Sequence, residues 1–411
     1  MKPLGEAQRE VLGAMAPLRE AEVPLADALG LCLTEDVVAP HPVPPFANSS
    51  VDGFAVRAAD TGGAPVDLEV LEDVAAGHPS TQDLRPGTAV RIMTGAPVPG
   101  GADAVVMVEH TVPSGPGRVR ALAPVAPGEG VRAAGSDLPA GAVVFSAGER
   151  LGPGHLGVLA ALGVARPRVR RRPRVAVLST GDEVVPPETE ALVPGAIRDA
   201  NRPLLAGLLG ELGAEVLDLG IVPDDAAQLA DALEAAAAAA DAVVTSGGVS
   251  VGDFDLVKQV LASLGGVQFW RVALQPGKPF AFGALGDTPL FGLPGNPVSV
   301  MVAFEQLVRP ALLHRMGARA LFRPRLPGRL ALGVCTDPER TAFLRVSAAY
   351  RGGGWEAAPS GAQDSHVLSA LARADAFAVV PAGVGDLAAG AEVELEMFRW
   401  PETRTMEEAL G

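Results

Sequence analysis

Cysteine is nearly absent from this 411-residue sequence, which contains only Cys32 and Cys335. Two cysteines cannot form a disulfide framework and have no neighbours at the spacing of a zinc site, so they fit a reducing cytoplasm. Basic residues are also scarce, because 33 lysines and arginines stand against 48 aspartates and glutamates, a formal net charge of −15. Nucleic-acid binding needs clustered positive charge to meet the phosphates, so this balance argues against a nucleic-acid partner.

The sequence also has no apolar run long enough to cross a membrane. Its uncharged stretch 288–304 contains three prolines and an asparagine, whereas a spanning helix needs about 20 apolar residues. The first ten residues carry charge where a signal peptide would have its apolar stretch. We therefore expect a cytoplasmic protein with no membrane partner.

Lysine is the scarcest charged residue type. Only Lys2, Lys258 and Lys278 are lysine, and the other 30 basic residues are arginine. Lys278 stands in a tight glycine–proline context, which suggests a chemical role for its charge. Six arginines gather in the segment RPRVRRRPR at 166–174. This segment is either an anion-binding strip or a solvated linker into the next domain, and we favour the linker.

The length and the 48% hydrophobic content provide for several domains. Helical patterns at 6–39 and 151–163 flank a stretch at 40–144 of short apolar runs and glycine–proline turns, typical of a small β-domain. Strands and helices alternate from 175 to 317, which predicts a multidomain α/β protein with a doubly wound, mainly parallel sheet. Short alternating runs return at 321–400 and indicate a second small β-domain.

Within the alternating region, we expect strands at 175–179, 215–221, 242–246, 267–273, 279–285 and 289–293. We expect helices at 201–212, 224–240, 253–264 and 297–314. Five strands are followed by loops rich in glycine, proline, hydroxyl and acidic residues, at 179–183, 223–225, 246–255, 275–279 and 294–297. Ligands of open α/β sheets bind beyond the carboxyl ends of the strands, so these loops predict one site at one edge.

The loop residues indicate a phosphorylated ligand with a magnesium ion. Gly247, Gly248 and Gly252 let backbone amides approach a ligand, and helix N-termini favour anions. Hydroxyls come from Thr180, Ser246 and Ser250. The carboxylates of Asp182, Glu183, Asp224, Asp225, Asp253 and Asp255 are hard oxygen ligands, which suit Mg²⁺ rather than zinc. Alternatively, Asp224 and Asp253 merely cap helices.

Several of these motifs resemble one family. SGGVSVGDFD at 246–255, PGKPFAF at 276–282 and GLPGNPVS at 292–299 resemble the molybdopterin molybdenumtransferase family, the MoeA and gephyrin E-domain type. The likeness extends to SSVDGFA at 49–55, IMTGAP at 92–97, GADAVVMVE at 101–109, GSD at 135–137, STGDE at 179–183 and SGAQDSH at 360–366. Together these motifs are specific, although any one glycine loop is not.

The resemblance implies a fold in four parts. These are a discontinuous, partly helical domain at 6–42 and 141–170, an inserted β-domain at 43–140, an α/β molybdopterin-binding domain at 171–318 and a C-terminal β-barrel at 319–400. It implies that molybdenum from molybdate is inserted into adenylylated molybdopterin with release of AMP, with Mg²⁺ as cofactor. It also implies a homodimer, in which the inserted domain of one chain reaches the α/β rim of the other, and molybdopterin adenylyltransferase as protein partner.

The resemblance also assigns roles to residues. Catalytic roles fall on Asp52, Thr94, Asp137 and Glu183. Pterin and nucleotide binding falls on Thr180, Gly247, Gly248, Ser250, Pro294, Asn296 and Pro297. Molybdate binding falls on Lys278, Arg340, Arg345 and Ser365, and metal binding on Asp225, Asp253 and Asp255.

Two of the departures from the family pattern concern the predicted molybdate pocket. Gln275 stands where many relatives have lysine, and Ala342 replaces an acidic residue, so either Arg340 or Arg345 could meet molybdate. Two other functions stay open: an adenylyltransferase-like enzyme on the same α/β domain, and a non-catalytic scaffold of the gephyrin type. The sequence does not decide between molybdate and tungstate.

Overall fold

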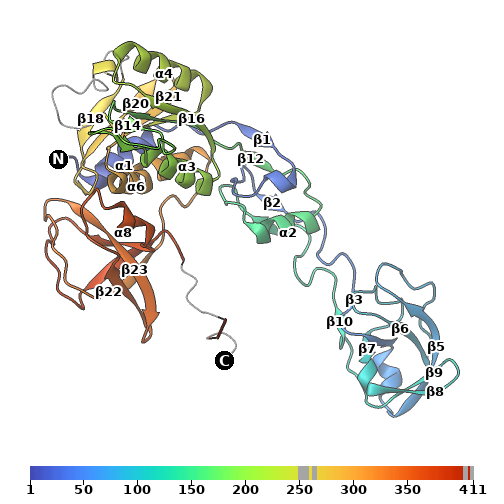
Figure 1. The fold of residues 1–411 in the computed structure, drawn as a ribbon. Helices are drawn as coiled ribbons and strands as arrows, with labels where there is room; N and C mark the ends of the chain where they lie inside the picture. Colours follow the sequence, from blue (N-terminus) through green and yellow to red (C-terminus); the bar gives the residue numbers. More distant parts are fainter. Residues whose placement is uncertain (249–258, 262–265, 401–405, 408–411) are drawn as a thin grey trace.

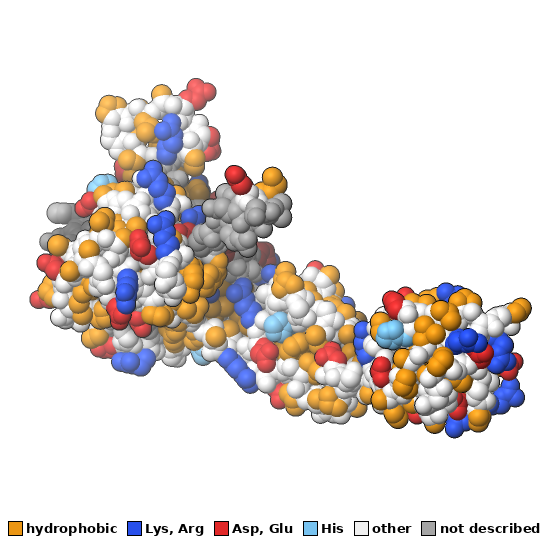
Figure 2. Space-filling view, turned by 90° about the horizontal axis from the view of Figure 1, so that it is seen from below, with side chains coloured by type: hydrophobic (Ala, Val, Ile, Leu, Met, Phe, Trp, Pro, Cys, Tyr) orange, Lys and Arg blue, Asp and Glu red, His pale blue; other side chains and the backbone are white. Residues whose placement is uncertain are grey.

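The computed structural model describes residues 1–248, 259–261, 266–400 and 406–407. The chain is elongated, with a large body at one end and a β-domain at the other (Figure 1). Figure 2 shows this outer domain, which carries the strands between 53 and 121, as a separate lobe. It is joined to the body, residues 174–318 with the C-terminal domain, through a smaller connector formed by 20–49 and 131–170. In the part of the chain that is described, no helix has the length and apolar character needed to span a membrane.

The outer domain is built on a six-stranded sheet in the order β7-β4-β6-β5-β9-β8. These strands are β4 (Gly53–Val56), β5 (Val66–Val74), β6 (Thr88–Ile92), β7 (Ala104–Met107), β8 (Thr111–Gly115) and β9 (Arg118–Ala121). In β9, Val119 and Ala121 are buried while the two arginines point outward, the period-two alternation of a half-buried strand. A Cβ at Gly53 would lie 2.1 Å from the Val106 carbonyl oxygen, so only glycine fits at this crossing.

The connector contains less helix than the sequence pattern predicts. Helix α1 (Leu4–Gly13) forms with Ala7 and Val11 buried, and it packs against the helical segment 304–315 of the body. The prediction of a helix after Pro24 is wrong, because only a 3₁₀ turn forms there, at Leu25–Asp27. Gly30 follows with a φ of 79°. Cys32 and Leu33 are buried, and they form antiparallel β-bridges with Arg150 and Val169, respectively. Tertiary pairing therefore overrides the local helical pattern here.

The connector is completed by short elements on both sides of the outer domain. They are β1 (Glu20–Glu22), β2 (Val37–Val38), β3 (Asn48–Ser49), β10 (Val131–Arg132), β11 (Val143–Phe145), α2 (Pro153–Ala161) and β12 (Arg168–Arg170). Strand β1 pairs with β12, β2 with β11 and β3 with β10, so the two chain passages run side by side.

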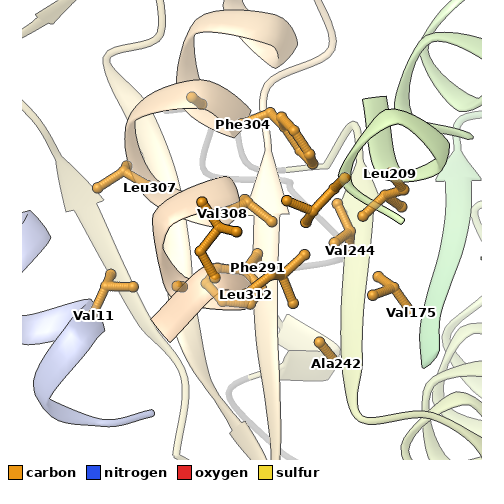
Figure 3. Close-up of a cluster of buried hydrophobic side chains, with 14 of the residues drawn as sticks. Val11, Val175, Leu209, Ala242, Val244, Phe291, Phe304, Leu307, Val308 and Leu312 are labelled. Atoms are coloured by element: carbon orange, nitrogen blue, oxygen red, sulfur yellow. The ribbon is translucent and has the colours of Figure 1, made fainter. Parts of the chain in front are cut away.

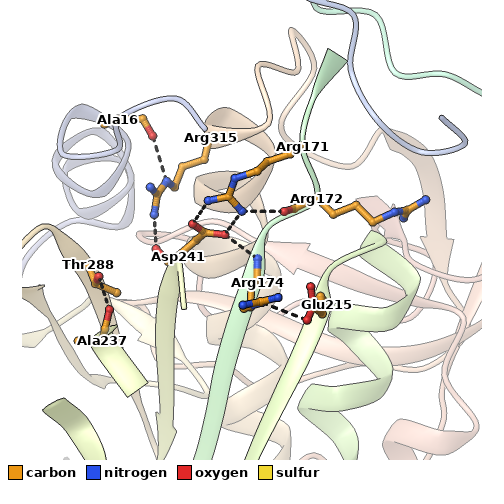
Figure 4. Close-up of polar contacts among 9 residues, drawn as sticks. All are labelled: Ala16, Arg171, Arg172, Arg174, Glu215, Ala237, Asp241, Thr288 and Arg315. Atoms are coloured by element: carbon orange, nitrogen blue, oxygen red, sulfur yellow. Dashed lines mark hydrogen bonds and ion pairs between the residues drawn. The ribbon is translucent and has the colours of Figure 1, made fainter. Parts of the chain in front are cut away.

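The arginines of 166–174 form hydrogen bonds and ion pairs with other residues of the same chain. Arg171 pairs with Asp241, whose carboxylate also accepts from the Arg174 backbone N–H at 2.8 Å, and Arg315 donates to the Asp241 carbonyl (Figure 4). The other arginines bond to acceptors elsewhere in the chain: Glu22, Glu20, Glu35, Leu18, Gly213, Asp27, Leu29 and Glu215. These contacts within the chain are consistent with the interpretation of the segment as a linker.

The body has a six-stranded sheet in the order β16-β13-β17-β21-β20-β18. Its strands are β13 (Arg174–Thr180), β16 (Glu215–Val222), β17 (Ala242–Ser246), β18 (Gln268–Arg271), β20 (Pro279–Leu285) and β21 (Thr288–Leu293). Strands β13, β16, β17 and β21 are parallel, and β20 is antiparallel to both of its neighbours. Strand β18 therefore points the same way as β21. This arrangement confirms the doubly wound, mainly parallel sheet.

Helices cover both faces of this sheet. Helix α3 (Asn201–Leu212) lies on one face, and α4 (Ala226–Ala239) packs on the other. Figure 3 shows Val175, Val244 and Phe291 of the sheet packed against Leu209 and Phe304. Helix α3 ends at Leu212, and Gly213 caps it with a left-handed φ of 88°. The glycine therefore marks the end of the helix, as the sequence predicts.

The helix expected at 297–314 forms with an interruption. Helix α6 (Pro297–Ala303) passes through a π-helical turn at Phe304–Val308 into α7 (Arg309–Arg315). Pro310 has no N–H to give to the carbonyl of Gln306 four residues earlier, and the Gln8 side chain donates to that carbonyl instead at 3.2 Å. Of the helix expected at 253–264, only residues 259–261 lie within the described chain.

The C-terminal domain is a closed barrel. Strands β22 (Arg325–Leu330), β23 (Thr341–Arg351), β24 (Gly354–Pro359), β25 (Ala376–Val380) and β26 (Glu392–Met397) run in the order β23-β24-β22-β26-β25, and β25 pairs back with β23. Helix α8 (Leu368–Ala372) precedes β25. Strand β19 (Leu274–Gln275) leaves the body and pairs with β23, so it joins the barrel to the loop that follows β18.

Candidate active site

The five loops predicted to share one edge line a single cavity of about 960 Å³. They follow strands whose carboxyl ends lie together because β13, β16, β17, β18 and β21 all point the same way. The barrel closes the remaining side with a loop at 363–365 and with Arg340. The body contributes Thr180, Gly181, Glu183, Ile197, Asp224, Gly247, Gly248, Gln275, Pro276, Gly277, Lys278, Pro279, Pro294, Gly295, Asn296 and Ser299.

Glycines bring backbone to the surface of this cavity. Gly247 and Gly248 have φ values of 94° and 68°, in the left-handed region that favours glycine. A Cβ at Gly247 would lie 2.8 Å from the Thr180 carbonyl oxygen. The loop after β17 can therefore pass close to β13, and it presents bare backbone to a ligand.

The positive charge of the cavity comes from Lys278 and Arg340, the two basic residues among its described lining residues. The Arg340 Nε donates to Asp337 Oδ2 at 2.7 Å. The Glu339 backbone N–H lowers the pKa of Asp337, and the charges of Arg340 and Lys278 add to this effect. Asp337 thus stays ionised and fixes the Arg340 guanidinium while neutralising part of its charge.

Arg345 lies behind the cavity wall, not on it. Its side chain is fully buried, and its Nη2 donates to the carbonyl oxygens of Ala362 at 2.8 Å and Asp364 at 3.2 Å. Burial lowers the pKa of this guanidinium. Gln363 strengthens the same contact, because its side chain accepts from the Arg345 N–H and donates to the Arg345 carbonyl. Arg345 therefore holds the 362–364 loop in place, and Arg340 is the arginine that a ligand in the cavity can reach.

Two asparagines join the cavity loops to one another. The Asn201 Nδ2 donates to the Gly295 carbonyl at 2.6 Å, and the Asn296 Nδ2 donates to Ser365 Oγ at 2.8 Å. Ser365 belongs to the barrel, so the second bond spans the two domains. The sequence reasoning missed Asn201, whose available signal was the Asp–X–Asn pattern at a helix start. Asp199 Oδ1 accepts from the backbone N–H groups of Asn201 and Arg202, which fixes that start.

The predicted catalytic residues are divided between two places. Glu183 lines the cavity. Asp52 and Thr94 form a pair in the outer domain, where the Thr94 N–H and hydroxyl donate to Asp52 Oδ1 at 2.7 and 2.8 Å. These bonds, the backbone one first, lower the pKa of Asp52. Asp137 is exposed on a loop near the connector. Within one chain, Asp52, Thr94 and Asp137 do not line the cavity.

The predicted metal ligands are also separated. Asp225 caps α4 by accepting from the Gln228 N–H at 2.9 Å, while its neighbour Asp224 lines the cavity. Asp253, Asp255 and the predicted ligand-binding Ser250 lie outside the described residues. The described residues contain no group of three or more His, Cys, Asp or Glu side chains placed to hold a metal ion.

Three family models cover most of the chain. The MoeA N-terminal region (domain I and II) matches residues 2–163, the probable molybdopterin binding domain matches 176–314, and the MoeA C-terminal region (domain IV) matches 327–398.

Relatives that align over nearly the whole chain carry the name of the same family. Molybdopterin molybdenumtransferase 2 of Mycobacterium tuberculosis is 40% identical over 405 residues, which are 96% of this chain and 99% of the relative. Molybdopterin molybdenumtransferase of Haemophilus influenzae is 38% identical over 403 residues, 97% of this chain and 99% of the relative. The crystal structure of a molybdopterin biosynthesis MoeA protein from Pyrococcus horikoshii superposes with a TM-score of 0.82 at 30% identity, covering 97% of this chain and 100% of that one.

Proposed function

This chain belongs to the molybdopterin molybdenumtransferase (MoeA) family and is a transferase of molybdenum cofactor biosynthesis, and we propose that it inserts molybdenum from molybdate into adenylylated molybdopterin and releases AMP. The observation that carries the proposal is the 960 Å³ cavity, where the five loops of the α/β sheet meet the barrel. The cavity combines bare glycine backbone with two positive charges, which suits a phosphorylated ligand and an oxyanion together.

In this proposal, different lining residues bind the molybdate and the phosphates, and one carboxylate handles a proton. Lys278 and Arg340 attract molybdate, a dianion that the net charge of −15 would otherwise repel. In this proposal the backbone N–H groups at Gly247 and Gly248, which line the cavity, donate hydrogen bonds to the phosphate oxygens. Ser365, held by Asn296, adds a hydroxyl from the barrel side. Glu183 places a carboxylate at the same cavity, where it can hold or move a proton.

Magnesium is part of this proposal as a cofactor. Asp224 and Glu183 bring two carboxylates to the cavity, and the family resemblance adds Asp253 and Asp255 from the segment outside the described residues. Carboxylate oxygens are the ligands that Mg²⁺ prefers, and the bound ion would supply charge neutralisation at the phosphates. Asp225 serves as the cap of α4 in this arrangement.

A homodimer would complete the site. Asp52 and Thr94 are exposed in the outer domain, which is a separate lobe from the body that holds the cavity (Figure 1). We propose that a second copy supplies this pair to the cavity. Molybdopterin adenylyltransferase, which makes the substrate, is the proposed protein partner.

The decisive assay measures molybdate-dependent release of AMP from adenylylated molybdopterin by the full-length protein. Release that rises with molybdate supports the proposal. No release at any molybdate concentration would refute it and favour a scaffold. Product formation from unmodified molybdopterin and ATP would instead indicate an adenylyltransferase.

The shared site has its own test in co-expressed variants. Asp52→Ala and Lys278→Ala should each be inactive alone, because each removes one half of every site. When both are expressed together at equal levels, random pairing restores one intact site in each mixed dimer, so about a quarter of the wild-type activity should return. No recovery in isolated mixed dimers would show that Asp52 does not act across the dimer.

A further inference from the structure

A second cavity, of about 580 Å³, lies at the amino ends of the parallel strands of the body sheet. Arg174 begins β13, Glu215 begins β16 and Asp241 directly precedes β17. The end of α4, at 238–240, forms another part of the wall. This cavity shares no lining residue with the active-site cavity, which lies at the carboxyl ends of the same strands. It is therefore a separate space.

Three further arginines close the second cavity from the side of the connector. Arg19 directly precedes β1, and Arg171 and Arg172 directly follow β12, the strand that pairs with β1. The Arg171 N–H donates to the Arg19 carbonyl at 3.1 Å, so the two passages of the chain stay together here. The cavity therefore lies at the joint between the connector and the body.

Positive charge is in excess in this cavity. Four arginines line it against two carboxylates, which leaves two positive charges. The C-terminus of α4 adds only about half a negative charge to this balance. The chain as a whole carries a formal net charge of −15, so the local excess runs against the overall charge. An anion is thus attracted to this joint and repelled by most of the remaining surface.

Two of these arginines have no carboxylate partner within the described part of the chain. The exposed side chain of Arg19 forms no hydrogen bond or ion pair with a described residue. Arg172 donates to carbonyl oxygens, those of Gly213 at 3.1 Å, Asp27 at 3.1 Å and Leu29 at 3.2 Å. Carbonyl oxygens carry no formal charge, so the positive charges of Arg19 and Arg172 are not neutralised.

The other two arginines are paired, but to different degrees. Arg171 donates to the partly buried Asp241 at 2.6 Å, and Figure 4 shows this pair beside Arg172 and Arg174. The Arg174 Nε donates to Glu215 at 3.0 Å, and both side chains of this ion pair are about half exposed. Ion pairs with such exposure contribute little to stability, so Arg174 is available to a ligand at small cost.

The lining selects a small oxyanion. A guanidinium presents paired N–H donors in a planar fork, which matches two oxygens of a phosphate. No aromatic side chain stands among the described lining residues, so a nucleobase would find no ring to stack on. We propose that Arg19, Arg172 and Arg174 bind inorganic phosphate at this joint, and that the bound ion fastens the connector to the body. This inference does not depend on the proposed function.

The test variant is Arg19→Gln, which removes a charge but no contact within the described chain. The melting temperature of the phosphate-free protein should therefore not change. Titration calorimetry of the full-length protein with inorganic phosphate, at constant ionic strength, should show binding about tenfold weaker. The rise in melting temperature that phosphate produces should shrink with it. Every variant is made in the Lys278→Ala background, which weakens anion binding in the active-site cavity.

Arg85→Gln is the matched control. Arg85 is exposed in the outer domain, and its printed hydrogen bonds, to Thr88, come from its backbone, so the substitution changes the net charge equally without touching the second cavity. This variant should bind phosphate as its parent does. Glu215→Gln should tighten phosphate binding, because it removes a negative charge and releases Arg174.

An AMP titration separates free phosphate from the phosphate group of a nucleotide. Arg19→Gln should leave AMP binding unchanged, because AMP depends on the active-site cavity. The inference is overturned if phosphate does not bind saturably, or if Arg19→Gln and Arg85→Gln weaken its binding equally. It is also overturned if Glu215→Gln weakens phosphate binding, or if Arg19→Gln weakens AMP as much as phosphate.

Discussion

The two arginines near the start of β23 should respond differently to substitution by methionine. Arg340 lines the cavity, whereas Arg345 is buried and donates to the carbonyl oxygens of Ala362 and Asp364. Arg340→Met should remove a charge that molybdate meets directly. Arg345→Met should act through the position of the 362–365 loop, which carries Ser365.

The magnitude for Arg345→Met follows from two opposing effects. Hydrogen bonds to charged groups contribute about 1.5–3 kcal/mol each, so losing the two Nη2 bonds costs about 3–6 kcal/mol. Removing a fully buried guanidinium returns several kcal/mol of desolvation free energy, and burial already lowers the pKa of this group. Methionine fills most of the volume. We therefore expect the free energy of unfolding to fall by only about 1–2 kcal/mol.

The assay is the KM for molybdate at low and high ionic strength, with thermal unfolding of each variant alongside. Arg340→Met should raise this KM, and the increase should shrink in high salt because the charge of this partly exposed arginine is screened. Arg345→Met should raise the KM by an amount that salt does not change. If Arg345→Met shows the larger, salt-sensitive increase, Arg345 meets molybdate directly and the division of roles is wrong.

Two further predictions concern the opposite edge of the sheet and the glycine loop. Burial alone would raise the pKa of Asp241, but Arg171 and the other donors overcome this and lower it. Asp241→Asn should therefore reduce the free energy of unfolding by about 1–2 kcal/mol at pH 7, after discounting for the exposure of Arg171. This deficit should vanish as the pH falls through the lowered pKa, and thermal unfolding that shows a constant deficit would contradict it. Gly247→Ala, at φ 94° with its Cβ 2.8 Å from the Thr180 carbonyl oxygen, should cost about 1–3 kcal/mol in urea unfolding. It should also weaken AMP binding in calorimetry, and wild-type values for both would reject the close approach.

The barrel forms part of the cavity wall, through Arg340 and the loop at 363–365. Strand β19 contains Gln275 and pairs with β23, so the same short segment borders the cavity and joins the barrel sheet. Gln275 Oε1 also accepts from the Asp337 N–H at 3.0 Å. The residue that replaces the usual lysine of the family therefore has a structural contact of its own, next to the residue that fixes Arg340.

Local patterns in the sequence determined much of this protein. The bounds of α3 follow from its periodicity and from Gly213, and the loops that follow the strands could be placed at one edge because parallel strands share a direction. The motifs indicated the family without any coordinates. These features depend on neighbours within a few residues or on a rule of topology, so a linear sequence contains them.

Only the tertiary structure decided which side chains reach the cavity. Arg340 and Arg345 are both arginines of one segment, yet one lines the cavity and the other is sealed behind it by the loop at 362–364. Asp224 and Asp225 are adjacent, yet one faces the cavity and the other caps a helix. The helix expected after Pro24 was lost to pairing with residues more than a hundred positions away. Such outcomes depend on contacts between distant segments, and side-chain identity and local spacing do not specify those contacts.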